Sequence, residues 1–315
     1  MVNVLLVGNG VHSNKRVLPS LKKLEAVNSI SILDRNVKIE KQLTDTIKIL
    51  PYGEVSHSQS FYDLGIVATP PYNHLESYEV IVNKCQTVLI EKPLTNNLDA
   101  LRAKSIKENL NKNKLIEALM YFHHPLWKKI INIVENSNIV EINTEFSVPH
   151  LSKDSYRYSA SKGGGSLFDQ GIYPISFAQQ LIKNSYEINS IETKSEDGFE
   201  VDLSGKISLN IDNKINFKGS WGLGCEYNNF VNLKDSNGNI YEIDFVYSKP
   251  DLTDINIFIT KGESKKSINI GIHDQFQNMY LDAINSNFSA FKYSNYNNLN
   301  LRYTLLEEVY KTIDL

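Results

Sequence analysis

A charged pair ends an apolar stretch in the first third of the chain. Residues 88–90 are Val-Leu-Ile and predict a buried strand, which turns polar at once in Glu91, Lys92 and Pro93. One interpretation is a strand that simply surfaces at a charge, with Pro93 preventing its continuation. The other is a reactive lysine at the carboxyl end of a parallel strand, where α/β proteins place their chemistry.

A second group of polar residues follows a glycine-rich stretch, GGGSLFDQGIY. This stretch predicts a loop that runs into a helix over residues 163–183. Asp169 and Tyr173 are four residues apart, so both side chains project from the same helix face. Taken alone, Tyr173 could equally be a core aromatic residue.

The first predicted strand runs directly into a glycine turn. A GxGxxG turn lets the backbone approach a pyrophosphate, which then lies at the positive N-terminus of the following helix. Serine replaces the third glycine here, and it is small enough for close packing of helix on strand. The predicted cofactor-binding residues of this turn are Gly8, Asn9, Gly10, Val11, His12 and Ser13.

The second predicted strand ends in Asp34, about twenty residues past the turn, where an acid binds the adenosine ribose hydroxyls. Because an acid there repels a 2′-phosphate, NAD(H) is favoured. Arg35 could bind a phosphate or stack on adenine, so NADP(H) stays an alternative, as does a solvated turn without a ligand. Thr69 and Pro70 end a further strand near the expected nicotinamide position, and His74 is interpreted as a helix-start residue of the same binding stretch.

Strands and helices alternate in the first third of the chain, and this order predicts a parallel, doubly wound Rossmann sheet. Strands are expected at 2–8, 29–34, 63–70 and 87–93, whereas residues 36–62 predict only a helix and a short strand. Beyond about residue 125, alternating strands and turn signals predict an open, mostly antiparallel sheet in an α+β domain. We therefore expect a dinucleotide-binding domain at 1–121 and a substrate-binding and oligomerisation domain at 122–315.

Composition excludes several classes of protein. The 315 residues carry a formal net charge of −3, which argues against nucleic acid or an anionic membrane as a partner. The two cysteines show no CxxC spacing, so neither a disulfide framework nor a zinc site is indicated. The adjacent His123 and His124 point to opposite faces, and His12, His57, His150 and His273 form no ligand spacing, so no metal is expected. No membrane span or signal peptide is recognised, and a cytoplasmic location is expected.

The glycine turn, ATPPYNH (68–74), EKP (91–93) and GGGSLFDQGIY, in this order, resemble the glucose-fructose oxidoreductase / inositol dehydrogenase / MocA family over essentially the whole chain. The resemblance implies that Lys92 lies at the nicotinamide ring and the substrate carbon, commonly before a cis proline. It implies that Tyr173 supplies a proton beside that lysine, which also stabilises the oxyanion. Asp169 would orient the pair or the substrate. Tyr156 and Arg157 match an aromatic–arginine pair near cofactor or substrate, against the alternative of a surface arginine.

The stretch 220–250 resembles the nucleotide-sugar ketoreductase branch of this family. We therefore expect an NAD(P)-dependent oxidoreductase acting on a CH–OH or keto carbon of a sugar, most specifically a nucleotide-linked deoxysugar. Two alternatives are a diol dehydrogenase acting on a free cyclic diol and a non-enzymatic, dinucleotide-binding sensor of the same fold. Apolar side chains of KISLNI (206–211) and FVNL (230–233) are expected to face outward from the open sheet and to build a homodimer or homotetramer.

Overall fold

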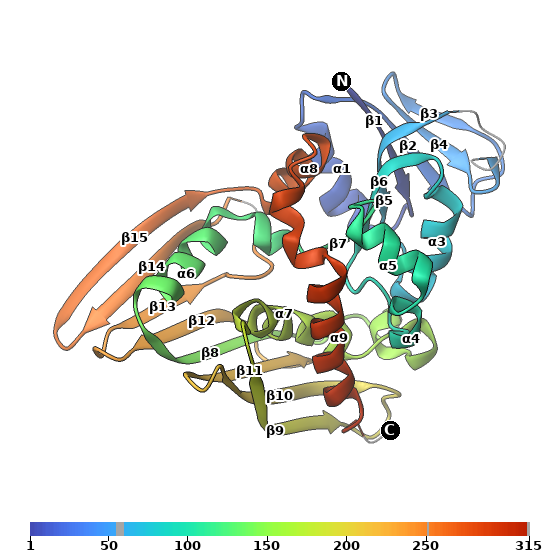
Figure 1. Ribbon diagram of the computed structural model, residues 1–315. Coiled ribbons are helices and arrows are strands. Elements are labelled where there is room, and N and C mark those ends of the chain that lie inside the picture. Colours follow the sequence, from blue (N-terminus) through green and yellow to red (C-terminus); the bar gives the residue numbers. More distant parts are fainter. Residues whose placement is uncertain (55–59, 251, 314–315) are drawn as a thin grey trace. The chain divides into compact units, whose positions relative to one another are not determined.

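The computed structural model describes residues 1–54, 60–250 and 252–313 and divides the chain into two compact units (Figure 1). The first unit comprises residues 1–120 and 275–300, and the second comprises residues 121–274 and 301–315. The expected fold class, a Rossmann sheet followed by an α+β domain with an open antiparallel sheet, is confirmed.

The first unit is built on a seven-stranded sheet of order β3-β4-β2-β1-β5-β6-β7. All pairs are parallel except β3–β4. Its central strands are continuous apolar runs because both faces of a parallel sheet are covered. The strands are β1 (Val2–Val7), β2 (Val27–Asp34), β3 (Lys41–Thr44), β4 (Ile47–Pro51), β5 (Tyr62–Val67), β6 (Cys85–Glu91) and β7 (Leu115–Ala118).

Short helices accompany these strands, and the last two of them come after every strand in the chain. The chain order is the π-helix η1 (Ser13–Val17), α1 (Leu18–Lys22), η2 (Pro71–Asn73), α3 (His74–Ile81), α4 (Leu98–Leu101), α5 (Lys104–Asn111), α8 (Gln275–Ile284) and η7 (Phe288–Ser294). Within residues 36–62, the chain forms the β3–β4 hairpin up to Pro51 and is helical at Glu54, and the rest of the expected helix lies outside the described residues. Strand β3 is exposed at every position, so its sequence carries no apolar period by which to recognise it.

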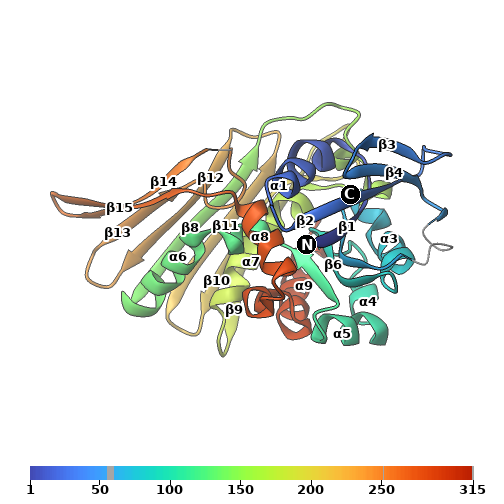
Figure 2. The same cartoon turned by 90° about the horizontal axis from the view of Figure 1, so that it is seen from above.

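The second unit contains an eight-stranded sheet of order β15-β14-β13-β12-β8-β11-β10-β9, antiparallel except for β8–β11. The strands are β8 (Ile139–Val148), β9 (Tyr186–Ser195), β10 (Asp202–Ile211), β11 (Ile215–Leu223), β12 (Asn228–Asp235), β13 (Ile240–Asp244), β14 (Asp254–Lys261) and β15 (Ser264–Ile272). Helices α6 (Pro125–Asn136) and α7 (Ile172–Leu181) pack on β8, and α7 also packs on β11 (Figures 1 and 2). Helix α9 (Tyr296–Tyr310) ends in this unit.

The outward face of this sheet differs from the sequence expectation. Phe217 of β11 stacks on Phe177 of α7, and Leu209 is paired with Phe217, so both face the helices. The same alternation buries Val231 and Leu233 completely or almost completely. The expectation that KISLNI and FVNL expose their apolar side chains is therefore wrong, except for the partly buried Phe230. The period of two sends Lys206 and its polar neighbours to the open face instead.

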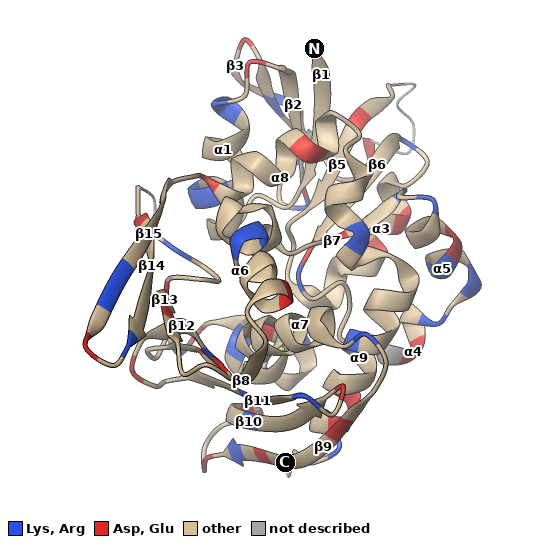
Figure 3. Cartoon of the chain, turned by 60° about the vertical axis from the view of Figure 1, so that its left-hand side comes forward, with Lys and Arg blue, Asp and Glu red and all other residues tan. Residues whose placement is uncertain are grey.

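Helix α7 is uncharged and almost wholly buried. It contains no Lys, Arg, Asp or Glu and is drawn wholly tan in Figure 3. Nine of its ten residues are buried. A helix of this kind must be covered by the fold on every side, which makes it a rigid carrier for the residues at its N-terminal end.

Candidate active site

The glycine turn is closely packed around Gly8. Its φ is +103°, and a Cβ atom here would lie 2.9 Å from the Ala68 carbonyl oxygen, so only glycine fits. Ser13 is fully buried and donates a hydrogen bond from Oγ to the Gly8 carbonyl oxygen at 2.8 Å. Serine therefore fastens the turn at the position of the third glycine. Gly10 faces open space, because no atom lies within 4 Å of its Cβ position, and this leaves room for a pyrophosphate.

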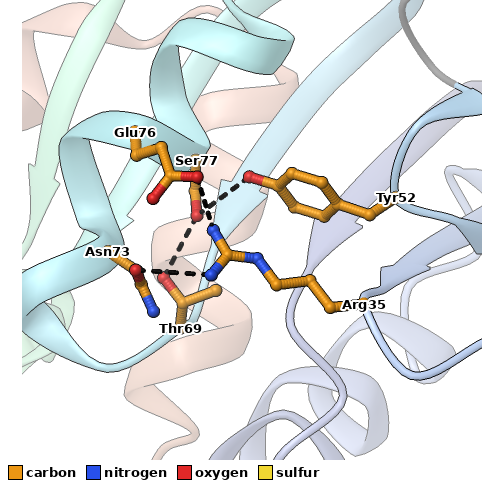
Figure 4. Close-up of polar contacts among 6 residues, drawn as sticks. All are labelled: Arg35, Tyr52, Thr69, Asn73, Glu76 and Ser77. Carbon is orange, nitrogen blue, oxygen red and sulfur yellow. Dashed lines mark hydrogen bonds and ion pairs between the residues drawn. The ribbon is translucent and has the colours of Figure 1, made fainter.

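Asp34 faces the glycine turn. Its Oδ2 accepts a hydrogen bond from Asn9 Nδ2 at 3.1 Å, and its Oδ1 accepts from the Asn36 backbone N–H at 2.8 Å. Arg35 contacts Asn73 and Glu76 at the start of α3 instead (Figure 4). The structure thus brings Asp34 and the turn together, as a ribose-binding acid requires.

The end of β5 leads into His74, the first residue of α3, as the sequence predicts. Its imidazole is buried between two carbonyl oxygens: Nδ1 lies 2.7 Å from Pro93 O and Nε2 lies 2.8 Å from Thr69 O. Burial lowers the pKa of His74, and its contacts with the two carbonyls act in the opposite direction. The ring connects the loop after β5 with the loop after β6, a positioning role that the sequence did not indicate.

The peptide bond between Lys92 and Pro93 is cis, as the family resemblance implies. Glu91, the last residue of β6, contacts His12 Nε2 at 3.0 Å through Oε1. Burial raises the pKa of Glu91, but His12 and Lys92 lower it more, and the net direction is down. Behind the turn, buried Glu117 accepts a hydrogen bond from the Leu94 backbone N–H at 2.8 Å. One carboxylate thus holds the residue before Lys92, and another holds the backbone two residues after it.

In the second unit, Asp169 and Arg157 form an ion pair. Arg157 Nε donates to Asp169 Oδ2, and Gln170 Nε2 donates to the same oxygen at 2.6 Å. The guanidinium of Arg157 lies over the Tyr156 ring, 4.8 Å from its centre. The Asp169 carboxylate raises the pKa of Arg157 further above its ordinary value. Arg157 is thus partly buried against Asp169, with 31% of its side chain exposed.

Tyr173 lies in a cluster of aromatic rings. Its ring centre is 4.8 Å from that of Phe146, 5.4 Å from that of Tyr247 and 6.0 Å from that of Tyr121. The preceding turn, η6 (Leu167–Gly171), is a π-helix rather than an α-helix. Such turns are rare and occur often at functional sites, and this one carries Asp169 immediately before α7 carries Tyr173.

Two further groups hold the start of this helix. Asp202, at the first position of β10, accepts hydrogen bonds from Ser166 Oγ and from the Leu167 backbone N–H. Trp221 is buried against the helix, and Gly205 leaves space for its ring, since a Cβ atom there would lie 2.3 Å from Trp221 Cζ2. The roles of Asp202 and Trp221 could not be recognised from sequence, because both residues lie on strands far from Asp169 along the chain.

Within the described residues, no three His, Cys, Asp or Glu side chains are placed to hold a metal ion, and His57 lies outside them. His123 and His124 are buried, and Nδ1 of His124 accepts a hydrogen bond from the Leu126 backbone N–H as a helix cap. In the parts of the chain that the structure describes, no helix is long and apolar enough to cross a membrane.

Two family models match the chain. The model of the oxidoreductase family with an NAD-binding Rossmann fold matches residues 2–121, and that of the GFO/IDH/MocA C-terminal domain matches residues 128–262.

Curated relatives and solved structures of the same kind are also similar to this chain. A dTDP-3,4-didehydro-2,6-dideoxy-α-D-glucose 3-reductase from Actinomadura kijaniata is 24% identical over 87% of this chain and 84% of its own. An enzyme of the same name from Saccharopolyspora spinosa is 23% identical over 79% of this chain and 76% of its own. The crystal structure of the A. kijaniata 3-ketoreductase KijD10 with NADP and TDP-benzene has a TM-score of 0.86 at 20% identity, covering 98% of this chain and 97% of that one.

Proposed function

The chain belongs to the Gfo/Idh/MocA family of oxidoreductases, and we propose that it reduces a keto group of a nucleotide-linked deoxysugar. The observation that carries the substrate class is the similarity, over most of both chains, to dTDP-sugar 3-reductases. The non-enzymatic sensor is not favoured, because these relatives are enzymes, and a free cyclic diol finds no support among them.

We propose Lys92 and Tyr173 as the catalytic residues. When bound, the reduced nicotinamide cofactor supplies the hydride that converts the ketone into an alkoxide. The Lys92 ammonium stabilises this developing negative charge, and the Tyr173 hydroxyl supplies the proton that turns the alkoxide into an alcohol. Solvent returns a proton to the tyrosine, so the reaction consumes one ketone, one reduced cofactor and one proton.

We assign a positioning role to the Arg157–Asp169 pair. Its two charges are satisfied by each other, by Gln170 Nε2 and by the face of the Tyr156 ring. Such a paired carboxylate is a poor proton donor, but a stable hydrogen-bond acceptor for sugar hydroxyls. Arg157 and Tyr156 also supply the cation and the ring face suited to a nucleotide diphosphate.

The Rossmann unit binds NAD(P)(H), and we propose NADP(H) as the working cofactor. The expectation that NAD(H) is favoured gains no support, because the similar solved 3-ketoreductase contains NADP. Arg35 is the cation available to a 2′-phosphate at the end of β2, and its side chain is 44% exposed. Asp34 is then left to the ribose and the glycine turn.

We propose further that the protein is a cytoplasmic homodimer or homotetramer that assembles through the open face of the eight-stranded sheet. The polar character of that face predicts an interface held by hydrogen bonds and ion pairs, such as those available to Lys206 and Glu192. Light scattering of the purified chain at low and high salt tests this assembly.

Cofactor oxidation by a panel of nucleotide-linked keto-deoxysugars, generated in place and followed by nicotinamide absorbance, tests the function. The wild type should oxidise NADPH with at least one dTDP-linked sugar. Lys92→Ala and Tyr173→Phe should bind NADPH with unchanged affinity and turn over about 10²- to 10⁴-fold more slowly. Unimpaired turnover by both variants would contradict the assignment of these residues, and the absence of turnover with every sugar would contradict the substrate class.

A further inference from the structure

Arg35 is held in a polar cluster at the ends of β2 and β4 and the start of α3 (Figure 4). Its Nη2 donates to Glu76 Oε1 at 2.8 Å, and its Nη1 donates to Asn73 Oδ1 at 3.4 Å. The guanidinium lies over the ring of Tyr52, 4.8 Å from the ring centre. Tyr52 and then Glu76 raise the pKa of Arg35, so it stays charged at every working pH.

Asp34 is not the acid that engages Arg35. Both of its oxygens accept hydrogen bonds elsewhere, from Asn9 of the glycine turn and from the Asn36 backbone. The carboxylate that neutralises Arg35 comes instead from Glu76, on a different element and 41 residues further along the chain. A ligand phosphate that binds Arg35 must therefore displace the Glu76 carboxylate from its guanidinium.

The Glu76 carboxylate is easily replaced on Arg35 by another anion. The two side chains are 44% and 61% exposed, and pairs of this exposure contribute little because water and salt screen them. A phosphate, with a charge near −2 and three acceptor oxygens, binds a guanidinium more strongly through two parallel hydrogen bonds. The Tyr52 ring keeps the guanidinium plane in place during such an exchange.

We propose that Glu76 sets the preference of this enzyme between NADP(H) and NAD(H) by occupying Arg35 and releasing it to the 2′-phosphate. The inference rests on the proposed use of NADP(H). It assigns to Glu76 an effect on one cofactor only, because NAD(H) has no group that competes for Arg35.

Titration of the full chain with NADPH and NADH, followed by nicotinamide fluorescence without any sugar, tests this proposal. Glu76→Gln should lower the Kd for NADPH about fivefold, the effect of freeing one exposed ion pair, and change the Kd for NADH less than twofold. Arg35→Ala should raise the Kd for NADPH about tenfold or more. Glu79→Gln is the matched control, since Glu79 is also exposed on α3 and the variant removes the same charge.

Three results would overturn the proposal. In the first, Glu76→Gln and Glu79→Gln shift the ratio of the two Kd values equally. In the second, Glu76→Gln keeps its full effect in an Arg35→Ala background, so that Glu76 acts by direct repulsion of the phosphate. In the third, Arg35→Ala leaves the ratio unchanged. If the wild type binds neither nucleotide, the proposed function itself fails, a result distinct from binding of both with an unmoved ratio.

Discussion

Replacement of Asp202 by alanine should destabilise the second unit by about 2–4 kcal/mol. Asp202 is 4% exposed, and its carboxylate accepts hydrogen bonds from two fully buried donors, Ser166 Oγ and the Leu167 backbone N–H. A buried donor left without an acceptor costs about 1–3 kcal/mol. Burial raises the pKa of Asp202, so removing the charge recovers some desolvation energy, and the expected loss lies in the lower half of the sum.

Unfolding in urea, followed by tryptophan fluorescence, measures this loss. Both tryptophans, Trp127 and Trp221, belong to the second unit, so the signal reports that unit. Both donors bind Oδ2, so Asp202→Asn can keep both hydrogen bonds through its one amide oxygen and should lose clearly less than Asp202→Ala. Asp197→Asn in the exposed loop before β10 is the control and should stay within about 0.5 kcal/mol of the wild type.

Asp202→Ala should also lower the catalytic rate, because the helix start that Asp202 holds carries Asp169 and, one turn later, Tyr173. Turnover by Asp202→Ala should fall while NADPH affinity, which belongs to the first unit, stays unchanged. If Asp202→Ala unfolds at the same urea concentration as Asp197→Asn, the cap does not hold this helix, and the reasoning is refuted.

Three further changes test other parts of the structure. His74→Leu leaves the Thr69 and Pro93 carbonyls without their ring donor, so thermal unfolding should show a loss of about 1–3 kcal/mol; turnover should fall more than NADPH affinity. Gly205→Ala places a methyl group inside the buried Trp221 ring contact and should cost about 1–3 kcal/mol in urea. Burial lowers the pKa of Lys249 to about 7, whereas an unfolded lysine holds its proton to about 10.4. Stability should therefore rise by roughly 2 kcal/mol from pH 7 to 9 relative to Lys249→Met, and equal pH dependence of the two proteins would contradict this.

Much of the fold could be predicted from local patterns. The alternating pattern expected beyond residue 125 is seen in β8, whose apolar and polar residues alternate as in a sheet with one covered face. Helix α6 begins at Pro125, in keeping with the preference of proline for the first helical position. Strand β3 was missed because it is exposed at every position and carries no apolar period. The outward face of the second sheet was misjudged because the apolar residues of its alternating strands point to the covered face of the sheet.

The residues of the candidate site that belong to a local motif could be predicted from sequence. The residues that hold those motifs in place from distant strands could not. The positions of Gly8 and Lys92 follow from motifs whose spacing is local. The partners of those motifs, such as Glu117 behind the lysine turn and Asp202 behind the helix, are single acids on distant strands. In sequence they resemble any solvated acid, and only the buried backbone donors that they satisfy reveal their role.

The central claim, hydride transfer to a keto carbon of a nucleotide-linked sugar, is tested most directly by isotope transfer. The protein would be incubated with NADPH deuterated at the transferable position and with a dTDP-linked 3-keto-deoxysugar, and the sugar product analysed by mass spectrometry and NMR. The account predicts one deuterium on the carbon that carried the ketone, and none when Tyr173→Phe and Lys92→Ala are combined. A product without deuterium, or the same incorporation by the double variant, would contradict it.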